Sequence, residues 1–281
     1  MPSGTGSGFV WDTEGHIVTN FHVVDRGEQF AVMLYDTSVL DATLVGYDPA
    51  TDLAVLKLVN PPADLVPVAM PDGSDSPQVG QMALAIGNPY GLDHTLTAGT
   101  VSAVGREIQG YGGVTIRGMI QTDAAINSGN SGGPLVDSSG QLMGVNTMIY
   151  SRSGSSAGLG FAVPAATVQR IVPQLIQEGR VKRPNPGITV LSAKVAQRTG
   201  LQGVVIEAVT PNSPAEQAGL VGLTVDRGRV RIGDVIVTVD GARVTTPNEL
   251  FHALDTHPVG APLVVGLVRD GVPRQVSFEM E

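Results

Sequence analysis

The sequence predicts a mainly β protein of two domains, and three observations carry that prediction. The 281 residues correspond to about two domains of ordinary size. Residues 1–164 consist of short apolar segments separated by turns, in a chain with 36 Gly and 19 Pro, which is typical of β-sandwiches and barrels. After the basic, proline-rich stretch 180–187, apolar segments and two short helices predict a small α+β domain.

The first domain is expected to contain short antiparallel strands and a C-terminal helix. Gly8–Trp11 and His16–Asn20 flank a turn and are expected to form a hairpin. The remaining expected strands are Phe30–Tyr35, Val39–Val45, Leu53–Leu58, Gln81–Ile86, Leu96–Val104, Gly118–Gln121, Leu142–Asn146 and Leu159–Val163. Apolar residues at i, i+3, i+4, i+7 and i+8 predict a helix over Ala165–Glu178. Pro173 is expected to kink this helix, and Gly179 to end it.

The second domain shows strand patterns and two helix starts. Strands are expected at Gly203–Ala208, Val235–Asp240, Leu263–Arg269 and Gln275–Phe278, the last two joined at Asp270-Gly271. Ser213-Pro214-Ala215-Glu216 and Thr246-Pro247-Asn248-Glu249 both fit a capping box with proline at the first helical position. Each therefore predicts a short helix.

The composition excludes several classes of function. Charged residues make up 15% and hydrophobic residues 42%, as in a folded globular protein. The net charge of −9 argues against binding to nucleic acid or to anionic lipid. There is no cysteine, no apolar run approaching the roughly 20 residues needed to cross a membrane, and no phosphate-binding loop for ATP. No metal or other cofactor is expected. Because no signal peptide is visible at Met1, we expect a trimmed part of a longer exported protein.

The octet Asn127–Pro134 is the strongest functional signal. It places Ser131 among small residues just before an apolar strand, with Gly129 and Gly132 leaving the backbone free to curl around the serine. Such a loop can aim several N–H groups at one point beside a hydroxyl, as stabilisation of an oxyanion requires. The alternative is an ordinary Gly/Ser/Asn turn.

Two residues upstream supply what a serine nucleophile needs. A serine hydroxyl requires an adjacent base, and His22 follows the apolar pair Ile17-Val18 closely. A carboxylate must orient that imidazole, and Asp52 touches the apolar strand Leu53–Leu58 and should be partly buried. Asp48 is the alternative acid, but it precedes Pro49 and is typical of a turn. The order His, Asp, Ser is that of the chymotrypsin fold. The other histidines (His16, His94, His252 and His257) have no metal-ligand spacing and are expected at surface or packing positions.

At these residues the chain resembles the HtrA/Deg serine proteases. The matching segments are Gly6-Ser7-Gly8-Phe9, Thr19–Val24, Thr51–Lys57, Ala85–Pro89, Gln121–Asn127 and Gly129–Pro134. The resemblance implies a chymotrypsin-like double β-barrel, of six strands each, over residues 1–178. It further implies a linker over 179–187 and a PDZ domain over 188–281, the latter matched by Ser213–Leu220 and Ile232–Ile236. One departure is Ser128, where the family usually has proline.

The resemblance also implies an activity and a set of site residues. We expect an ATP-independent endopeptidase that degrades unfolded or damaged proteins through an acyl-enzyme, with His22, Asp52 and Ser131 as its triad. Gly129, Asn130 and Ser131 would form the oxyanion hole. The substrate pocket would be lined by Ala125, Ile126, Asn146 and Thr147. Trypsin-like enzymes carry an acid where Ala125 stands, so an apolar pocket that prefers small aliphatic side chains is expected. Two Gly-rich segments, 106–113 and 151–158, are expected to be mobile regulatory and pocket loops.

The PDZ resemblance implies capture of C-terminal or extended peptides at a sheet edge. The expected contacts come from Gly187, Ile188, Val190, Leu250, Phe251 and Leu254. Pro186 departs from the family pattern because it lacks an N–H donor. An apolar core stripe without a ligand is the alternative, and the insert 221–230 resembles the plant and photosynthetic branch.

Family resemblance further implies a homotrimer or a multiple of it. The implied compartment is the periplasm or, alternatively, the thylakoid lumen. The competing hypothesis for function is a peptide-binding holdase chaperone or scaffold with an inert protease domain.

Overall fold

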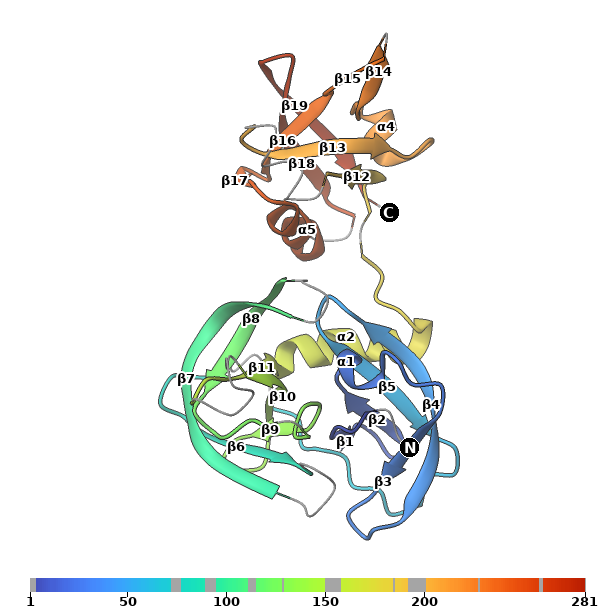
Figure 1. Cartoon of the computed structure of the whole chain (residues 1–281), viewed down its shortest axis with the longest axis vertical. Helices are drawn as coiled ribbons and strands as arrows, with labels where there is room; N and C mark the ends of the chain where they lie inside the picture. The colour runs from blue at the N-terminus through green and yellow to red at the C-terminus, as the bar shows by residue number, and fades with distance from the viewer. Residues whose placement is uncertain are drawn as a thin grey trace. The chain divides into compact units, whose positions relative to one another are not determined.

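The protein divides into two compact units, residues 1–181 and 182–281 (Figure 1). The computed structural model describes residues 4–71, 77–88, 95–110, 115–127, 129–149, 158–183, 185–191, 201–226, 228–257 and 260–280. Strands dominate both units, so the predicted mainly β class is confirmed. Of the two expected mobile loops, residues 111–113 and 151–157 fall outside the described residues, as do His94 and Ser128. Residues 106–109 of the first loop belong instead to strand β7 (Thr95–Gln109).

The N-terminal half of the first unit is an antiparallel sheet. Its order is β1 (Phe9–Val10), β2 (His16–Thr19), β5 (Leu53–Leu58), β4 (Val39–Asp48) and β3 (Phe30–Met33). Among the described residues this sheet has five strands, where six were expected. The segment after β5 makes only isolated backbone contacts, such as Val68 N–H to the carbonyl of Val10 at 3.0 Å. Pro67 and Pro71 flank it, and proline cannot donate to a strand ladder.

The second half of the unit is a closed six-stranded barrel (Figure 1). Around the barrel the strands are β10 (Leu142–Ile149), β11 (Gly160–Pro164), β8 (Thr115–Thr122), β7 (Thr95–Gln109), β6 (Met82–Gly87) and β9 (Pro134–Val136). Helix α2 (Ala165–Glu178) follows as predicted, continues through Pro173, and ends at Gly179 with a left-handed φ of 70°. Its buried stripe shares one core with Leu53 and Val55 of the first sheet and with barrel strands. The two sheets are thereby joined through α2.

In its described residues, the second unit consists of a six-stranded sheet, two helices and a separate two-stranded ribbon. Its strands run β12 (Ile188–Val190), β13 (Val204–Val209), β16 (Asp234–Val239), β18 (Pro262–Arg269) and β19 (Val272–Glu279), with β17 (Ala242–Arg243) beside β16. Both predicted helices are present as α4 (Pro214–Gln217) and α5 (Pro247–Thr256), each capped by the expected Ser or Thr. The predicted insert forms a separate ribbon of β14 (Thr224–Asp226) and β15 (Arg229–Arg231).

Candidate active site

His22 lies on a single helical turn, α1 (Phe21–Val24), which follows directly after β2. The turn is tied to the residue before β5, because the Asp52 carbonyl accepts hydrogen bonds from Phe21 N–H at 3.1 Å and Asn20 Nδ2 at 2.9 Å. Asp52 itself has φ of 57°, an uncommon conformation for a residue with a side chain. These hydrogen bonds hold α1 beside the start of β5, although His22 and Asp52 are 30 residues apart in the sequence. The His22 imidazole therefore lies against the Asp52 carboxylate.

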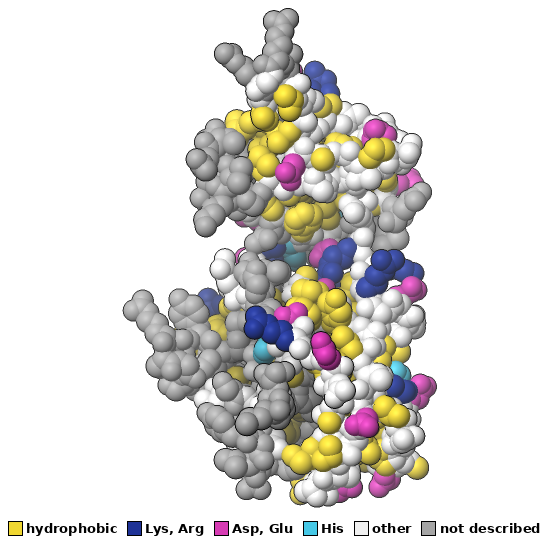
Figure 2. Space-filling model, turned by 45° about the vertical axis from the view of Figure 1, so that its right-hand side comes forward, with side chains coloured by type: hydrophobic (Ala, Val, Ile, Leu, Met, Phe, Trp, Pro, Cys, Tyr) yellow, Lys and Arg dark blue, Asp and Glu magenta, His cyan; other side chains and the backbone are white. Residues whose placement is uncertain are grey.

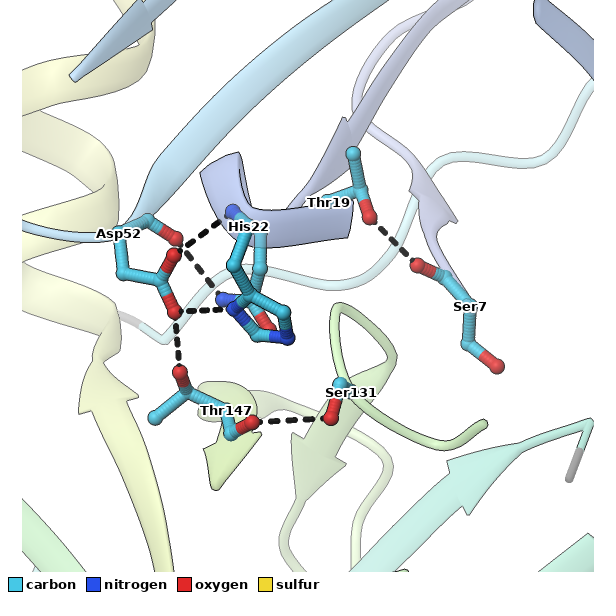
Figure 3. Close-up of polar contacts among 7 residues, drawn as sticks. Ser7, Thr19, His22, Asp52, Ser131 and Thr147 are labelled. Carbon is cyan, nitrogen blue, oxygen red and sulfur yellow. Dashed lines mark hydrogen bonds and ion pairs between the residues drawn. The ribbon is translucent and has the colours of Figure 1, made fainter. Parts of the chain in front are cut away.

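The Asp52 carboxylate is almost fully buried, at 1% exposure, and accepts three hydrogen bonds (Figure 3). Oδ1 accepts from the backbone N–H of His22 at 3.0 Å, and Oδ2 lies 2.8 Å from His22 Nδ1. The hydroxyl of Thr147 also donates to Oδ2. A carboxylate can only accept, so the Nδ1 proton belongs on His22 and the other ring nitrogen is free of a proton when the ring is neutral. That tautomer is the one a general base requires.

Ser131 reaches the same place from the loop between β8 and β9. Its Oγ donates to the backbone carbonyl of Thr147 at 2.9 Å, while the Thr147 hydroxyl bonds Asp52. Figure 3 shows His22 with its Nδ1 edge toward Asp52 and with Ser131 on the other side of the ring. The three residues proposed from the sequence therefore converge around Thr147. In this rotamer the Ser131 proton points at a carbonyl, so a rotation about Cα–Cβ is needed to offer it to His22.

The backbone around Ser131 is held by a series of hydrogen bonds. Gly129 and Gly132 have φ of 109° and 86°, conformations that favour glycine. The carbonyl of Asn130 accepts from Gly133 N–H at 3.1 Å, and Gly132 N–H donates to Asn146 at 2.7 Å. The C=O and N–H groups of a trans peptide point in opposite directions. Since the Asn130 carbonyl points toward Gly133, the N–H of Ser131 in the same peptide points away from Gly133. Within the described part of the chain no acceptor contacts this N–H, so it is a ready oxyanion donor.

Asn130 supports the loop from inside. It is 2% exposed, and its N–H donates to the carbonyl of Asn127 at 3.2 Å. Its side-chain amide accepts from Asn127 N–H at 3.0 Å and donates to the carbonyl of Ala125 at 3.1 Å. The N–H of Asn130 is thus already used in this conformation, leaving Ser131 and Gly129 as the oxyanion donors suggested by the sequence.

The residues expected to line the substrate pocket have different environments. Ala125 is half-buried, and its carbonyl also accepts from Thr97 Oγ1 at 2.9 Å. Ile126 is fully buried in the barrel core. Asn146 is also fully buried and donates from Nδ2 to the carbonyl of Pro134 at 3.1 Å. Thr147 contacts Asp52 and Ser131, a role that the sequence pattern did not signal.

In the second unit, β12 is the edge strand expected to receive a peptide. Ile188, Leu250 and Leu254 are buried together in the core of this unit, whereas Phe251 on α5 is 45% exposed. Val190 packs partly against the same core. The N–H of Gly187 donates to its neighbour Asn185 Oδ1 at 2.8 Å. That amide proton would have to leave Asn185 to bind a terminal carboxylate.

The remaining described histidines lie outside the candidate site. His16 Nδ1 lies 2.6 Å from Asp12, and His257 Nδ1 lies 2.7 Å from Asp240. His252 is exposed on α5. Among the described residues no group of His, Asp and Glu could hold a metal ion.

Comparison with known proteins assigns a domain type to each unit. A family model of the trypsin-like peptidase domain matches residues 6–145, and a PDZ model matches residues 184–280. Protease Do-like 1, chloroplastic, from Arabidopsis thaliana is 45% identical over 283 residues, covering 100% of this chain and 64% of that protein. The periplasmic serine endoprotease DegP of Escherichia coli (strain K12) is 40% identical over 282 residues, covering 98% of this chain and 56% of that protein.

Solved structures agree with these matches. The HtrA-type protease AlgW with a decapeptide has a TM-score of 0.75 at 37% identity, covering 98% of this chain and 82% of that one. A serine endoprotease from Yersinia pestis has a TM-score of 0.70 at 34% identity, covering 98% of this chain and 88% of that one.

Proposed function

Because the chain belongs to the HtrA family of serine proteases, we propose that it is an endopeptidase that cleaves peptide bonds through an acyl-enzyme on Ser131. The observation that carries the proposal is the buried carboxylate of Asp52, which holds Nδ1 of His22 at 2.8 Å while both Asp52 and Ser131 bond Thr147. A histidine that only fills space in the core would not be expected to bond a buried carboxylate and also lie near a serine whose backbone N–H has no acceptor among the described residues.

The mechanism follows from the chemistry of these groups. Ser131 Oγ rotates from the Thr147 carbonyl toward His22, transfers its proton to the imidazole, and attacks the substrate carbonyl. Asp52 stabilises the imidazolium that forms. The N–H groups of Ser131 and Gly129 bind the oxyanion, and each such donor lowers the barrier by roughly 3–4 kcal/mol. His22 then gives its proton to the leaving amine, and water reverses the sequence to release the acyl group.

We further propose the wider role that the resemblance to the HtrA/Deg family implies. The chain spans 64% and 56% of the length of the two curated relatives described above, so activity toward unfolded or damaged proteins, independence of ATP, and trimeric assembly are proposals for this chain. One of those relatives is named as periplasmic and the other as chloroplastic, which supports a compartment outside the cytoplasm. None of the described helices combines the length and the apolar character needed to span a membrane.

The second unit is proposed as the peptide-binding module, over 188–281, joined by 179–187 to the catalytic domain over 1–178. Support comes from the PDZ match and from the edge position of β12, whose Ile188 shares one core with Leu250 and Leu254 of α5. On the face drawn in Figure 2, the described Lys and Arg side chains lie in small separate groups among acidic ones, as the net charge of −9 leads one to expect. This pattern favours polypeptide over nucleic acid as the partner.

The test is degradation of unfolded casein by the wild-type chain and by Ser131→Ala. We expect cleavage by the wild type, without ATP, and none by the variant. Equal degradation by both proteins would refute the role of Ser131. If neither protein degrades casein but both suppress aggregation of an unfolded client equally, the chain is a holdase instead.

A further inference from the structure

Ser7 belongs to the N-terminal segment that precedes β1, and it contacts the nucleophile loop through both backbone and side chain. Its N–H donates to the carbonyl of Ser131 at 2.8 Å. Its hydroxyl donates to the carbonyl of Gly129 at 2.6 Å and accepts from the N–H of Asn88 at 2.9 Å. Its own carbonyl accepts from Thr19 Oγ1 at 2.7 Å, a contact drawn in Figure 3. The polar groups of this one residue therefore join four separate segments of the first unit.

The two carbonyls that Ser7 holds are those on either side of the nucleophile's amide. The peptide that begins at Gly129 is bonded at both ends, through Ser7 Oγ and through Asn130 N–H to Asn127. The peptide that begins at Ser131 is likewise bonded at both ends, by Ser7 N–H and by Gly132 N–H to Asn146. The peptide between them carries the free N–H of Ser131. The carbonyl of this middle peptide is held by the N–H of Gly133, and Ser7 holds the peptides on both sides of it. Ser7 therefore helps to orient a donor that it does not contact.

Ser7 sits in a narrow space bounded by glycines. A Cβ on Gly87 would lie 2.9 Å from Ser7 Oγ, and one on Gly133 would lie 3.1 Å from Ser7 Cβ. A Cβ on Gly132 would collide with the Ser7 carbonyl. The backbones of these three glycines therefore pack directly against Ser7, and a side chain at any of the three positions would press on it.

We propose that Ser7 is a positioning residue for the oxyanion hole, whose hydroxyl fixes the Gly129 carbonyl so that the N–H groups of the nucleophile loop face the substrate. The inference rests on the proposed protease function and adds a residue outside the triad and its loop. An oxyanion forms only in the transition state, so a poorly held loop lowers kcat more than it changes KM.

The experiment compares wild type, Ser7→Ala and Ser38→Ala on a fluorescence-quenched peptide that the wild type cleaves. Ser38 is the matched control, because its hydroxyl also makes a short bond, 2.6 Å to Asp36, but in an exposed turn of the first sheet. We expect kcat of Ser7→Ala to fall about 10-fold or more, short of the roughly 10²–10³-fold expected for deletion of a donor, with KM within about 2-fold. Ser38→Ala should match wild type.

A second readout separates positioning from general support of the fold. A peptidyl trifluoromethyl ketone forms a hemiketal with the nucleophilic serine, and the pKa of the hemiketal hydroxyl, followed by ¹⁹F NMR, reports how well the oxyanion is stabilised. Ser7→Ala should raise that pKa, while its thermal midpoint stays near that of wild type. If Ser7→Ala fails to fold, Thr19→Val replaces it, since this isosteric change frees the Ser7 carbonyl. The same direction of change in kcat and hemiketal pKa is then expected.

The outcomes distinguish the two levels of the proposal. A wild-type chain that neither cleaves the peptide nor forms the hemiketal overturns the proposed function, and this inference with it. A wild-type chain that does both, while Ser7→Ala equals it in kcat and in hemiketal pKa, overturns the inference alone. A loss in Ser7→Ala confined to KM, with an unchanged hemiketal pKa, also contradicts it.

Discussion

Replacing Asp52 by asparagine exchanges one carboxylate oxygen for an NH₂ group at a side chain that accepts three hydrogen bonds. In one orientation the new NH₂ occupies the Oδ1 position, where it opposes the N–H of His22 that now donates at 3.0 Å. In the other it occupies the Oδ2 position and donates to His22 Nδ1, now 2.8 Å away, forcing the proton onto Nε2. In this second orientation the Thr147 hydroxyl can rotate and accept a hydrogen bond from the new NH₂ group. In the first orientation the backbone N–H of His22 cannot become an acceptor. The orientation with the wrong tautomer is therefore favoured.

The size of the effect can be worked from these contacts. Placing the asparagine NH₂ against the N–H of His22, at a site only 1% exposed, costs about 1–3 kcal/mol. This cost determines how small a fraction of the variant keeps the proton on Nδ1 of His22. Even the molecules in this fraction lack the carboxylate charge beside the imidazolium. The charge-assisted hydrogen bond that they lose contributes about 1.5–3 kcal/mol. Together these costs are about 2.5–6 kcal/mol, which corresponds to a loss of roughly 10²–10⁴-fold in kcat.

The assay is steady-state cleavage of a fluorescence-quenched peptide by wild type, Asp52→Asn and Asp48→Asn. Asp48 is the matched control because it is also buried, at 2% exposure, but its carboxylate accepts from Ala50 and Thr51 in the adjacent turn. Asp48→Asn should stay within about 3-fold of wild type in kcat, as expected for a residue away from the reacting atoms. Thermal unfolding followed by emission of Trp11, the only tryptophan, checks that both variants fold.

One result would refute this reasoning outright. If Asp52→Asn kept more than about a tenth of wild-type kcat, the carboxylate would contribute under about 1.4 kcal/mol and could not be holding the tautomer. A larger loss in Asp48→Asn than in Asp52→Asn would point to the wrong acid.

Two further predictions concern the second unit. Arg269→Met removes the guanidinium that binds Asp234 at 2.6 and 2.7 Å, which leaves a fully buried carboxylate without a counter-charge and with the N–H of Val221 as its remaining partner. This unit should therefore lose about 3–5 kcal/mol of unfolding free energy, measured in urea by circular dichroism. A loss below about 1 kcal/mol would contradict the role of the ion pair. Hydrogen bonds to the Ala261 carbonyl and then to Asp240 raise the pKa of His257 above its ordinary 6.5. The resulting stabilisation is complete below that value and is lost as pH rises through the folded-state pKa. The thermal unfolding midpoint of this unit should therefore be lower at pH 8.5 than at pH 6, and His257→Gln should abolish the difference. An equal midpoint at the two pH values in the wild type would show that His257 does not pair with Asp240.

Features set by neighbouring residues could be predicted from the sequence. Helix α2 and its end at Gly179 follow from an apolar stripe and a glycine stop, and both are confirmed. The hairpin at Asp270-Gly271 is confirmed as well, with φ of 51° and 77° at the two turn residues. In each case the residues that form the sequence pattern also form the structural element, or lie within a few residues of it.

Features that depend on distant partners could not be predicted. The turn α1 is held by the carbonyl of Asp52, which lies 32 residues from Asn20 in the sequence and accepts hydrogen bonds from Asn20 and Phe21. The hydroxyl of Thr147 reaches Asp52 across 95 residues, and Ser7 reaches Gly129 across 122. No local pattern signals such contacts. The sequence predicted His22, Asp52 and Ser131 as a catalytic group, but it could not predict the rotamer of Ser131 or the residues that hold its loop.

The most direct test of the central claim is covalent labelling by a fluorophosphonate, with the site located by peptide mass mapping. A serine phosphonylates readily only when a base takes its proton and an oxyanion hole receives the developing charge. The account predicts one label per chain, on Ser131, with labelling abolished in Ser131→Ala and slowed at least about 100-fold in His22→Ala. A folded chain that takes up no label, or that is labelled at another serine as fast in both variants as in wild type, would contradict it.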